Sequence, residues 1–185
     1  MNRGLQVKAK FESYLGQFVY GAIDGSVTTF AIVAGAAGAN LSNNIIIILG
    51  IANLVADGFS MGASAYLSAK SKRDLRKRDN DQHDHDHGET PVGDGLATFI
   101  AFVIVGFIPV LVYVIAAILG LPESDGLFAV AAFITAAVFM SIGVLKAGVT
   151  KTNPLIEGLE TLLLGGIAAG LAYLLGNVLA KALGA

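Results

Sequence analysis

The chain has 185 residues, of which 55% are hydrophobic and 14% are charged. Its mean hydropathy of +0.70 is too high for an ordinary soluble domain, in which about a quarter of the residues are charged. There is no cysteine, so disulfide frameworks and thiolate metal sites are excluded. The net charge of −2 supplies no long-range field that would recruit nucleic acid, and we expect no nucleic-acid partner.

Five apolar stretches are each long enough to cross about 30 Å of hydrocarbon, which takes about 20 helical residues. They cover residues 18–38, 44–69, 95–120, 126–149 and 156–180. We therefore predict an all-α integral membrane protein in which residues 1–185 form one five-helix domain, with a His/Asp-rich loop over residues 70–94. Asp24 interrupts the apolar run of the first stretch, which favours a retained helix over a cleaved signal peptide.

The basic residues lie almost entirely in three segments that alternate with the spans. These are Arg3, Lys8 and Lys10 before the first span; Lys70, Lys72, Arg73, Arg76, Lys77 and Arg78 after the second; and Lys146 and Lys151 around the end of the fourth. With five spans, these segments share one side of the membrane, which then holds eleven of the twelve Lys and Arg residues. The positive-inside rule makes that side cytoplasmic and predicts an N-in, C-out topology.

Two predicted spans carry acidic residues, which are costly in hydrocarbon and usually face a cavity or a partner. Polar or small residues recur at three- and four-residue spacing as Gln17, Gly21, Asp24 and Thr28 in the first span and as Asn53, Asp57, Met61 and Ser64 in the second. No Lys or Arg lies deep enough in either span to neutralise the two acids. The natural counter-charge is a proton or a transported cation.

Counting about 1.5 Å per residue places Asp24 and Met61 at a similar depth, with Thr28 and Asp57 about 6 Å further from the cytoplasmic edge. Two antiparallel helices would then present a carboxylate beside a thioether, and a hydroxyl beside a carboxylate. Carboxylates bind hard divalent cations, whereas a thioether favours softer transition metals. Two structural alternatives stay open: Asp24 as a protonated acid in an interhelical hydrogen bond, and Met61 as a packing residue.

The loop after the second span has two parts. Residues 70–78 are basic and are predicted to extend the second helix, held by anionic headgroups at the membrane surface. Residues 79–87, DNDQHDHDH, contain every histidine of the chain. The imidazoles and carboxylates of this tract are predicted to capture borderline metals weakly, and a solvated linker is the alternative. The residues concerned are His83, Asp84, His85, Asp86 and His87.

Glu157 and Glu160 lie one turn apart near the start of the fifth span. They are predicted to form an acidic cytoplasmic vestibule for cations, although favourable interaction with the helix N-terminus explains them equally well. Asp94 is predicted to cap the third span. The small-residue spacing of Gly21 and Gly25 suits a close helix contact, and we place a dimer axis there.

Four segments carry a family resemblance. The first two spans contain YGAIDGSVTTFAIVAGAAGA (20–39) and LGIANLVADGFSMGASAYLS (49–68), and the third and fifth contain GFIPVLVY (106–113) and NPLIEGLETLLLGGIAAGLAYLLG (153–176). Together they resemble the vacuolar iron transporter family, most specifically through the motifs DG-x-x-T and ADG-x-SM. The resemblance implies a five-helix, N-in and C-out homodimer. Its first helices would line a path along which Fe²⁺ or Mn²⁺ leaves the cytoplasm in exchange for protons.

The resemblance also implies that the pathway Asp and Met of the family fall on Asp24 and Met61. The chain departs from the family at two places. Ser64-Ala65-Tyr66 replaces the Gly-Glu-Tyr that often follows the methionine motif. The second gap of about 25 residues contains no Met and cannot hold the long cytoplasmic metal-binding domain of the better-known eukaryotic members.

These observations predict a divalent transition-metal transporter that exports Fe²⁺ and/or Mn²⁺ by proton antiport, with no cofactor beyond the transported metal. An intramembrane aspartyl protease is the enzyme alternative, but neither Asp24 nor Asp57 lies in a GxGD motif, so we predict no enzyme. A membrane metal sensor or scaffold that binds through the His tract, with an expendable Asp24, is the other alternative. The expected location is the inner membrane of a prokaryotic cell or a vacuolar-type membrane of a eukaryote.

Overall fold

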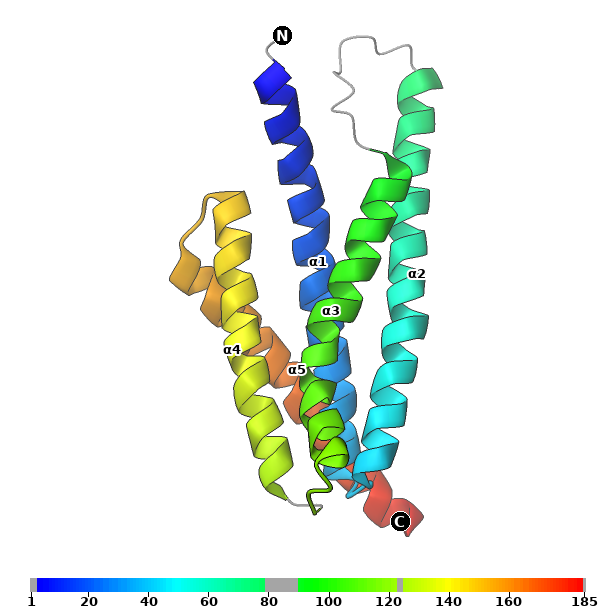
Figure 1. Cartoon of the computed structure of the whole chain (residues 1–185), viewed down its shortest axis with the longest axis vertical. Helices are drawn as coiled ribbons and strands as arrows, with labels where there is room; N and C mark the ends of the chain where they lie inside the picture. The colour runs from blue at the N-terminus through cyan, green and yellow to red at the C-terminus, as the bar shows by residue number, and fades with distance from the viewer. Residues whose placement is uncertain (1–2, 79–89, 123–124, 185) are drawn as a thin grey trace.

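The computed structural model describes residues 3–78, 90–122 and 125–184, and within them it contains five α-helices. These are α1 (Arg3–Gly38), α2 (Asn43–Arg78), α3 (Pro91–Ile118), α4 (Asp125–Thr150) and α5 (Pro154–Leu183). Successive helices run in opposite directions along the long axis, and α5 crosses the others obliquely (Figure 1). As a result, α1 begins at the opposite end of the bundle from the end where α5 finishes.

Each helix contains a stretch long and apolar enough to cross a membrane, which confirms the predicted all-α class with five candidate spans in the described part of the chain. The helices are longer than the predicted spans, because hydropathy marks only the part of a helix that suits hydrocarbon. α1 begins at Arg3 and α2 continues through the basic run to Arg78. Residues 70–78 are therefore helical, which confirms that they extend the second helix, and residues 91–94 of the predicted loop belong to α3.

Glycine contacts hold α1 and α2 against α3. A Cβ atom added at Gly25 of α1 would lie 2.5 Å from the Phe102 carbonyl oxygen of α3, and one added at Gly106 of α3 would lie 2.7 Å from the Gly25 carbonyl oxygen. On the other side of α3, a Cβ added at Gly62 of α2 would lie 2.9 Å from the Gly95 carbonyl oxygen. Because the neighbouring atoms are backbone and cannot rotate away, glycine is what allows these helices to come this close.

These contacts correct one prediction from the sequence. Gly21 is buried against the backbone of Thr98, and Gly25 is buried against that of Phe102. The placement of a dimer axis at Gly21 and Gly25 is therefore wrong, because α3 of the same chain already covers this surface. The spacing of small residues identifies a close helix contact, but it does not identify which helix makes the contact.

Apolar side chains fill the space between α1, α3, α4 and α5. The larger buried group includes Phe30 and Val33 of α1, Tyr113 of α3 and Phe139 of α4. The ring of Phe30 also stacks on Phe128, with ring centroids 6.2 Å apart. Large apolar side chains are common on the outer faces of the bundle as well, a distribution that suits a hydrocarbon surrounding rather than water.

We expect Gly25→Ala to destabilise the protein. The added methyl group meets backbone atoms of Phe102 at 2.5 and 2.8 Å, so α1 and α3 must separate, at a cost of about 1–3 kcal/mol, the usual range for overpacking. The thermal midpoint of the detergent-solubilised protein measures this loss. Gly166→Ala is the matched control, because nothing lies within 4 Å of a Cβ added there. Equal midpoints for the two variants would contradict the assigned α1–α3 contact.

Candidate functional site

The side chains of the predicted intramembrane path come from two neighbouring helices, and all are half-buried. They are Asp24 and Thr28 of α1 and Asn53, Asp57 and Met61 of α2. The fold brings Asp24 and Asp57 near each other, since each precedes a glycine that packs on Phe102 of α3. In the part of the chain that the structure describes, no Lys or Arg forms an ion pair with either carboxylate.

The contacts with α3 set the relative levels of α1 and α2. Phe102 packs on Gly25 of α1 and also on Gly58 of α2, so these two glycines lie at a similar level in the bundle. Asp24 precedes Gly25 by one residue and Asp57 precedes Gly58 by one. Because the helices are antiparallel, these steps go in opposite directions and separate the two acids by about 3 Å in level.

Met61 lies on the other side of Asp24. It follows Gly58 by three residues, which places it about 3 Å in level from Asp24, toward the basic end of the bundle. The sequence predicted a similar depth for Asp24 and Met61, and for Thr28 and Asp57. The contacts with Phe102 keep Asp24, Asp57 and Met61 within about one helical turn of one another in level.

Hydrogen bonds orient the polar groups beside these acids. The Thr28 hydroxyl donates to the Asp24 carbonyl oxygen at 2.8 Å, which leaves the hydroxyl oxygen as an acceptor for a ligand. The Asn53 Nδ2 amide donates across the helix contact to the Thr29 hydroxyl oxygen at 3.5 Å. This bond commits the amide nitrogen, so the carbonyl oxygen of Asn53 is the group left to bind a cation. Thr29, which the sequence analysis did not single out, is completely buried.

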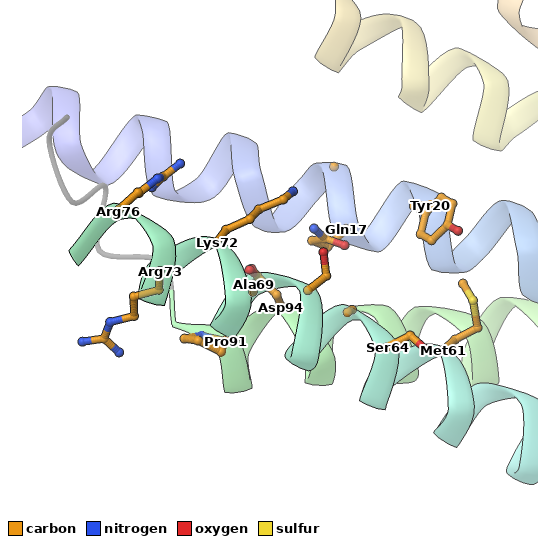
Figure 2. Close-up of a pocket in the computed structure, with 13 residues that line it drawn as sticks. Gln17, Tyr20, Met61, Ser64, Ala69, Lys72, Arg73, Arg76, Pro91 and Asp94 are labelled. Atoms are coloured by element: carbon orange, nitrogen blue, oxygen red, sulfur yellow. The ribbon is translucent and has the colours of Figure 1, made fainter. Parts of the chain in front are cut away.

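A cavity of about 600 Å³ opens between α1, α2 and the start of α3. Gln17 and Tyr20 line it from α1, Met61 and Ser64 from α2, and Asp94 from α3 (Figure 2). Met61 lies at its inner end, so the cavity leads from the basic end of the bundle toward the level of the two acids.

The outer part of the cavity is basic. Lys72, Arg73 and Arg76 line it from the last turns of α2, and the side chains of Lys72 and Arg76 extend toward α1 (Figure 2). Arg76 lies about 22 Å along α2 from Met61. Asp94 is the one acid among the lining residues that the structure describes, so three cations and one carboxylate give this lining a net charge of +2.

Asp94 and Tyr20 were not predicted from the sequence to line this cavity. Asp94 is not a cap: Thr90 precedes α3, and its hydroxyl accepts a backbone N–H of the first turn at 3.1 Å. The side chain of Asp94 is instead buried in the cavity wall. Tyr20 lies across the cavity from Met61 (Figure 2), and its position one helical turn before Asp24 was the available signal. Nothing in the sequence pattern linked Asp94 to α2.

The donor groups near Asp24 define the chemistry that this region offers. They comprise two carboxylates, a hydroxyl oxygen, an amide oxygen and a thioether sulfur. Oxygen donors suit Mn²⁺, and the sulfur adds affinity for softer divalent metals such as Fe²⁺ or Co²⁺. Within the described residues, no three or more His, Cys, Asp or Glu side chains gather as a metal-binding group.

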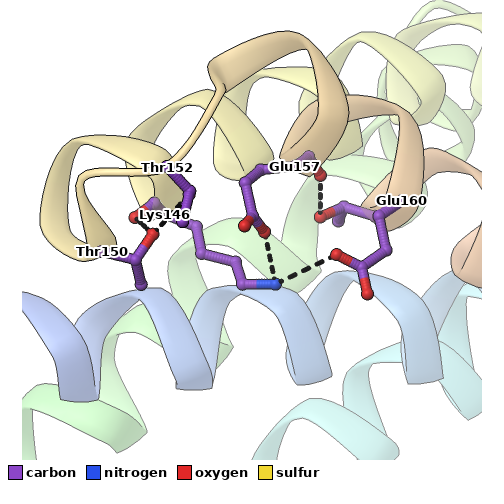
Figure 3. Close-up of polar contacts among 6 residues, drawn as sticks. Lys146, Thr150, Thr152, Glu157 and Glu160 are labelled. Carbon is purple, nitrogen blue, oxygen red and sulfur yellow. Dashed lines mark hydrogen bonds and ion pairs between the residues drawn. The ribbon is translucent and has the colours of Figure 1, made fainter.

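The two acids of the predicted vestibule share a cation at the junction of α4 and α5 (Figure 3). The Lys146 Nζ lies 2.6 Å from Glu157 Oε2 and 3.5 Å from Glu160 Oε2. In the sequence, Lys146 indicates only topology; the short connection between the two helices brings it over the start of α5. With Lys146 included, this group carries one net negative charge rather than two.

The predicted metal-capture tract lies outside the described residues. It comprises His83, Asp84, His85, Asp86 and His87. The helices on either side are described: α2 ends at Arg78, and α3 begins at Pro91, which lines the cavity. The tract is thus connected in sequence to the wall of the cavity.

Comparison with known proteins gives matches along most of the chain. The model of the VIT family matches residues 15–90 and 79–177. Vacuolar iron transporter 1 of Arabidopsis thaliana is 26% identical over 214 residues, covering 86% of this chain and 84% of that protein. The vacuolar iron transporter of Plasmodium berghei is 24% identical over 226 residues, covering 91% of this chain and 83% of that protein.

A shorter match has higher identity. The vacuolar iron transporter of Toxoplasma gondii is 47% identical over 62 residues, which are 34% of this chain. The match covers 20% of the Toxoplasma protein, and a similar match covers 22% of the relative from Plasmodium falciparum. This chain therefore aligns with about a fifth of the length of these two relatives.

We expect Lys146→Met to lower the thermal midpoint of the protein, because it leaves the Glu157 side chain, which is 12% exposed, beside Glu160 without a cation. The double variant Lys146→Met/Glu157→Gln should recover most of that loss, since the amide removes the uncompensated charge. Lys181→Met, at an exposed position of α5, controls for the loss of a cation. A double variant no more stable than Lys146→Met alone would contradict this role of the ion pair.

Proposed function

The chain belongs to the VIT family, and from this membership and the arrangement of α1 and α2 we propose that it transports Fe²⁺ and/or Mn²⁺ out of the cytoplasm in exchange for protons. One observation carries the proposal. Asp24 and Asp57 lie on two apolar helices, each one residue before a glycine that packs on Phe102, with no ion-pair partner in the described residues. Acids inside a membrane need a counter-charge, which a metal ion and protons can supply in turn.

In this proposal the cavity is the cytoplasmic entrance. A metal ion passes Tyr20 and Ser64, meets the Met61 sulfur and the Asp24 carboxylate, and moves on to Asp57, Thr28 and the Asn53 amide oxygen. The half-buried positions of these groups support a path that lets a hydrated ion exchange water for protein donors one step at a time. Protonation of the two acids after the metal leaves would keep the path electrically compensated and produce antiport.

The direction of transport follows from the proposed orientation. The N-terminal end of α1, the last turns of α2 and the α4–α5 connection lie toward the same end of the bundle (Figure 1). Eleven of the twelve Lys and Arg residues belong to these segments, and the positive-inside rule makes this end cytoplasmic. The host membrane would be the inner membrane in a prokaryote or a vacuolar-type membrane in a eukaryote.

Three further elements complete the proposal. The tract of His83, His85 and His87, with Asp84 and Asp86, would raise the local metal concentration at the cytoplasmic end. Glu157 and Glu160 would attract cations to the same end, with Lys146 reducing their combined charge. A homodimer would form through the side of α1 that α3 leaves exposed, where Tyr20 has 59% of its surface accessible.

We expect Asp24→Asn to reduce metal uptake by about tenfold or more, since loss of a supporting residue alone costs about 10–100-fold in metal affinity at ordered sites. The amide keeps the side-chain volume and eases burial, so the protein should still insert and fold. Initial uptake of Fe²⁺ and Mn²⁺ into proteoliposomes, with and without a pH gradient, measures the effect. Asp74→Asn, at an exposed position near the end of α2, is the control.

The same measurement separates the proposed transporter from a metal sensor. A sensor that binds through the His tract would tolerate Asp24→Asn and would move no metal in either form. Uptake at the wild-type rate by Asp24→Asn would show that the path does not use this carboxylate.

We expect Met61→Leu to reduce the uptake of Fe²⁺ or Co²⁺ more than that of Mn²⁺. Leucine keeps the apolar volume, and this exchange costs less than about 1.5 kcal/mol in packing. It removes the soft sulfur donor, on which harder Mn²⁺ depends less. Initial rates for the metals, measured in the same liposome preparation, give the selectivity ratio. An unchanged Fe²⁺/Mn²⁺ ratio would assign Met61 to packing.

A further inference from the structure

The basic lining of the cavity does not serve the proposed metal path directly. Lys72, Arg73 and Arg76 place three positive charges at the outer end of a cavity whose inner end holds Met61. A lining of one charge sign concentrates ions of the opposite sign and excludes ions of the same sign. The described lining residues therefore favour an anion, since Asp94 is the one acid among them.

Lys72, Arg73 and Arg76 differ from the other basic residues at the end of α2 because they line the cavity. Lys70, Lys77 and Arg78 belong to the same basic run of α2 and are also exposed, but they do not line the cavity. Lys72 and Arg76 are one helical turn apart, and both extend toward α1 across the cavity, whereas Arg73 points outward at its edge (Figure 2). Attraction of α2 to a charged membrane surface would not require some of its basic residues to line a cavity and others to lie outside it.

The remaining lining suits a phosphate group attached to a lipid. Gln17, Tyr20, Ser64 and Ser68 add hydrogen-bonding groups below the cations, and guanidinium groups bind phosphate oxygens in pairs. The volume of about 600 Å³ is within the range of about 300–1,000 Å³ typical of ligand sites. The run of charges begins directly after the apolar part of α2, at the level where headgroups lie, and basic pockets between membrane helices suit anionic headgroups.

We propose that this cavity binds the phosphate headgroup of an anionic phospholipid, with Lys72 and Arg76 across the headgroup and Arg73 at its outer edge. The acyl chains would extend from the cavity into the surrounding hydrocarbon. The site does not depend on the proposed transport, because binding is measured without it. A bound headgroup would also reduce the positive charge in front of Met61.

Two triple variants that have the same net charge test the site. Lys72→Gln/Arg73→Gln/Arg76→Gln removes the cavity cations, and Lys70→Gln/Lys77→Gln/Arg78→Gln removes the same number of cations from the same stretch of α2. Native mass spectrometry of the full chain in neutral detergent, titrated with dioleoyl phosphatidylglycerol, gives the affinity for the first bound lipid. Dioleoyl phosphatidylcholine is the uncharged reference.

We expect the wild type to bind phosphatidylglycerol in preference to phosphatidylcholine. We expect the cavity triple to bind phosphatidylglycerol about tenfold more weakly than the outer triple, since a cation that contacts the phosphate directly contributes more than one that is only near the headgroup. An equal loss in both triples would overturn the proposal, because it would show attraction to the basic run as a whole. So would equal binding of the two lipids by the wild type.

A second variant keeps every charge and guards against misfolding of the triples. Ala69 lines the cavity (Figure 2), so Ala69→Leu should obstruct the headgroup and weaken phosphatidylglycerol binding about tenfold. Ala56→Leu adds the same volume at an exposed position of α2 outside the cavity and should bind like the wild type. Equal binding by these two variants would place the lipid elsewhere and overturn the proposal.

Soluble anions distinguish the source of the phosphate. Inorganic phosphate and glycerol 1-phosphate at millimolar concentration should displace little phosphatidylglycerol, because they lack the acyl chains. If either displaced the lipid completely from the wild type and not from the cavity triple, the cavity would be a site for a soluble phosphate, and the lipid assignment would be wrong.

Discussion

The close packing of α3 between α1 and α2 is the contact on which the candidate site depends. Gly25 and Gly106 on one side, and Gly62 and Gly95 on the other, bring the backbones of the three helices together where any Cβ atom would meet a carbonyl oxygen. Because Phe102 rests on both α1 and α2, a shift of either helix along its axis would change the level of Asp24 relative to Asp57 and Met61. The glycines therefore act on the site without contributing a donor group to it.

The acids of the candidate path and the basic run of α2 lie at different levels along the bundle. This separation bears on whether the acids need a mobile ion. The two acids of α1 and α2 have no cation beside them in the described residues, while the last turns of α2 carry a dense basic run. A buried acid with a permanent ion-pair partner would hold its charge compensated and have no need of a mobile ion. Lys146 shows the contrast, since it compensates Glu157 and Glu160 at the junction of α4 and α5.

Membership of the VIT family and the physical properties of the residues are two separate sources of information about this chain. The family match extends over all five helices, and the relatives aligned over most of this chain are named vacuolar iron transporters. The polar stripes of α1 and α2 identify one region within that match, from the cost of acids in hydrocarbon. The cavity with its basic lining was found by neither route, because it belongs to the spaces between helices.

The sequence by itself determined the class of fold, the number of candidate spans and the two helices that carry intramembrane acids. These properties are local: hydropathy over about 20 residues and the spacing of polar side chains on one helix can be read without knowing any neighbour. Only the tertiary structure decided that Gly21 and Gly25 pack on α3, that Lys146 pairs with Glu157 and Glu160, and that Asp94 shares a cavity with Lys72. Each of these contacts joins residues on different helices, and the packing of the helices selects it from several pairings that the sequence pattern allows equally.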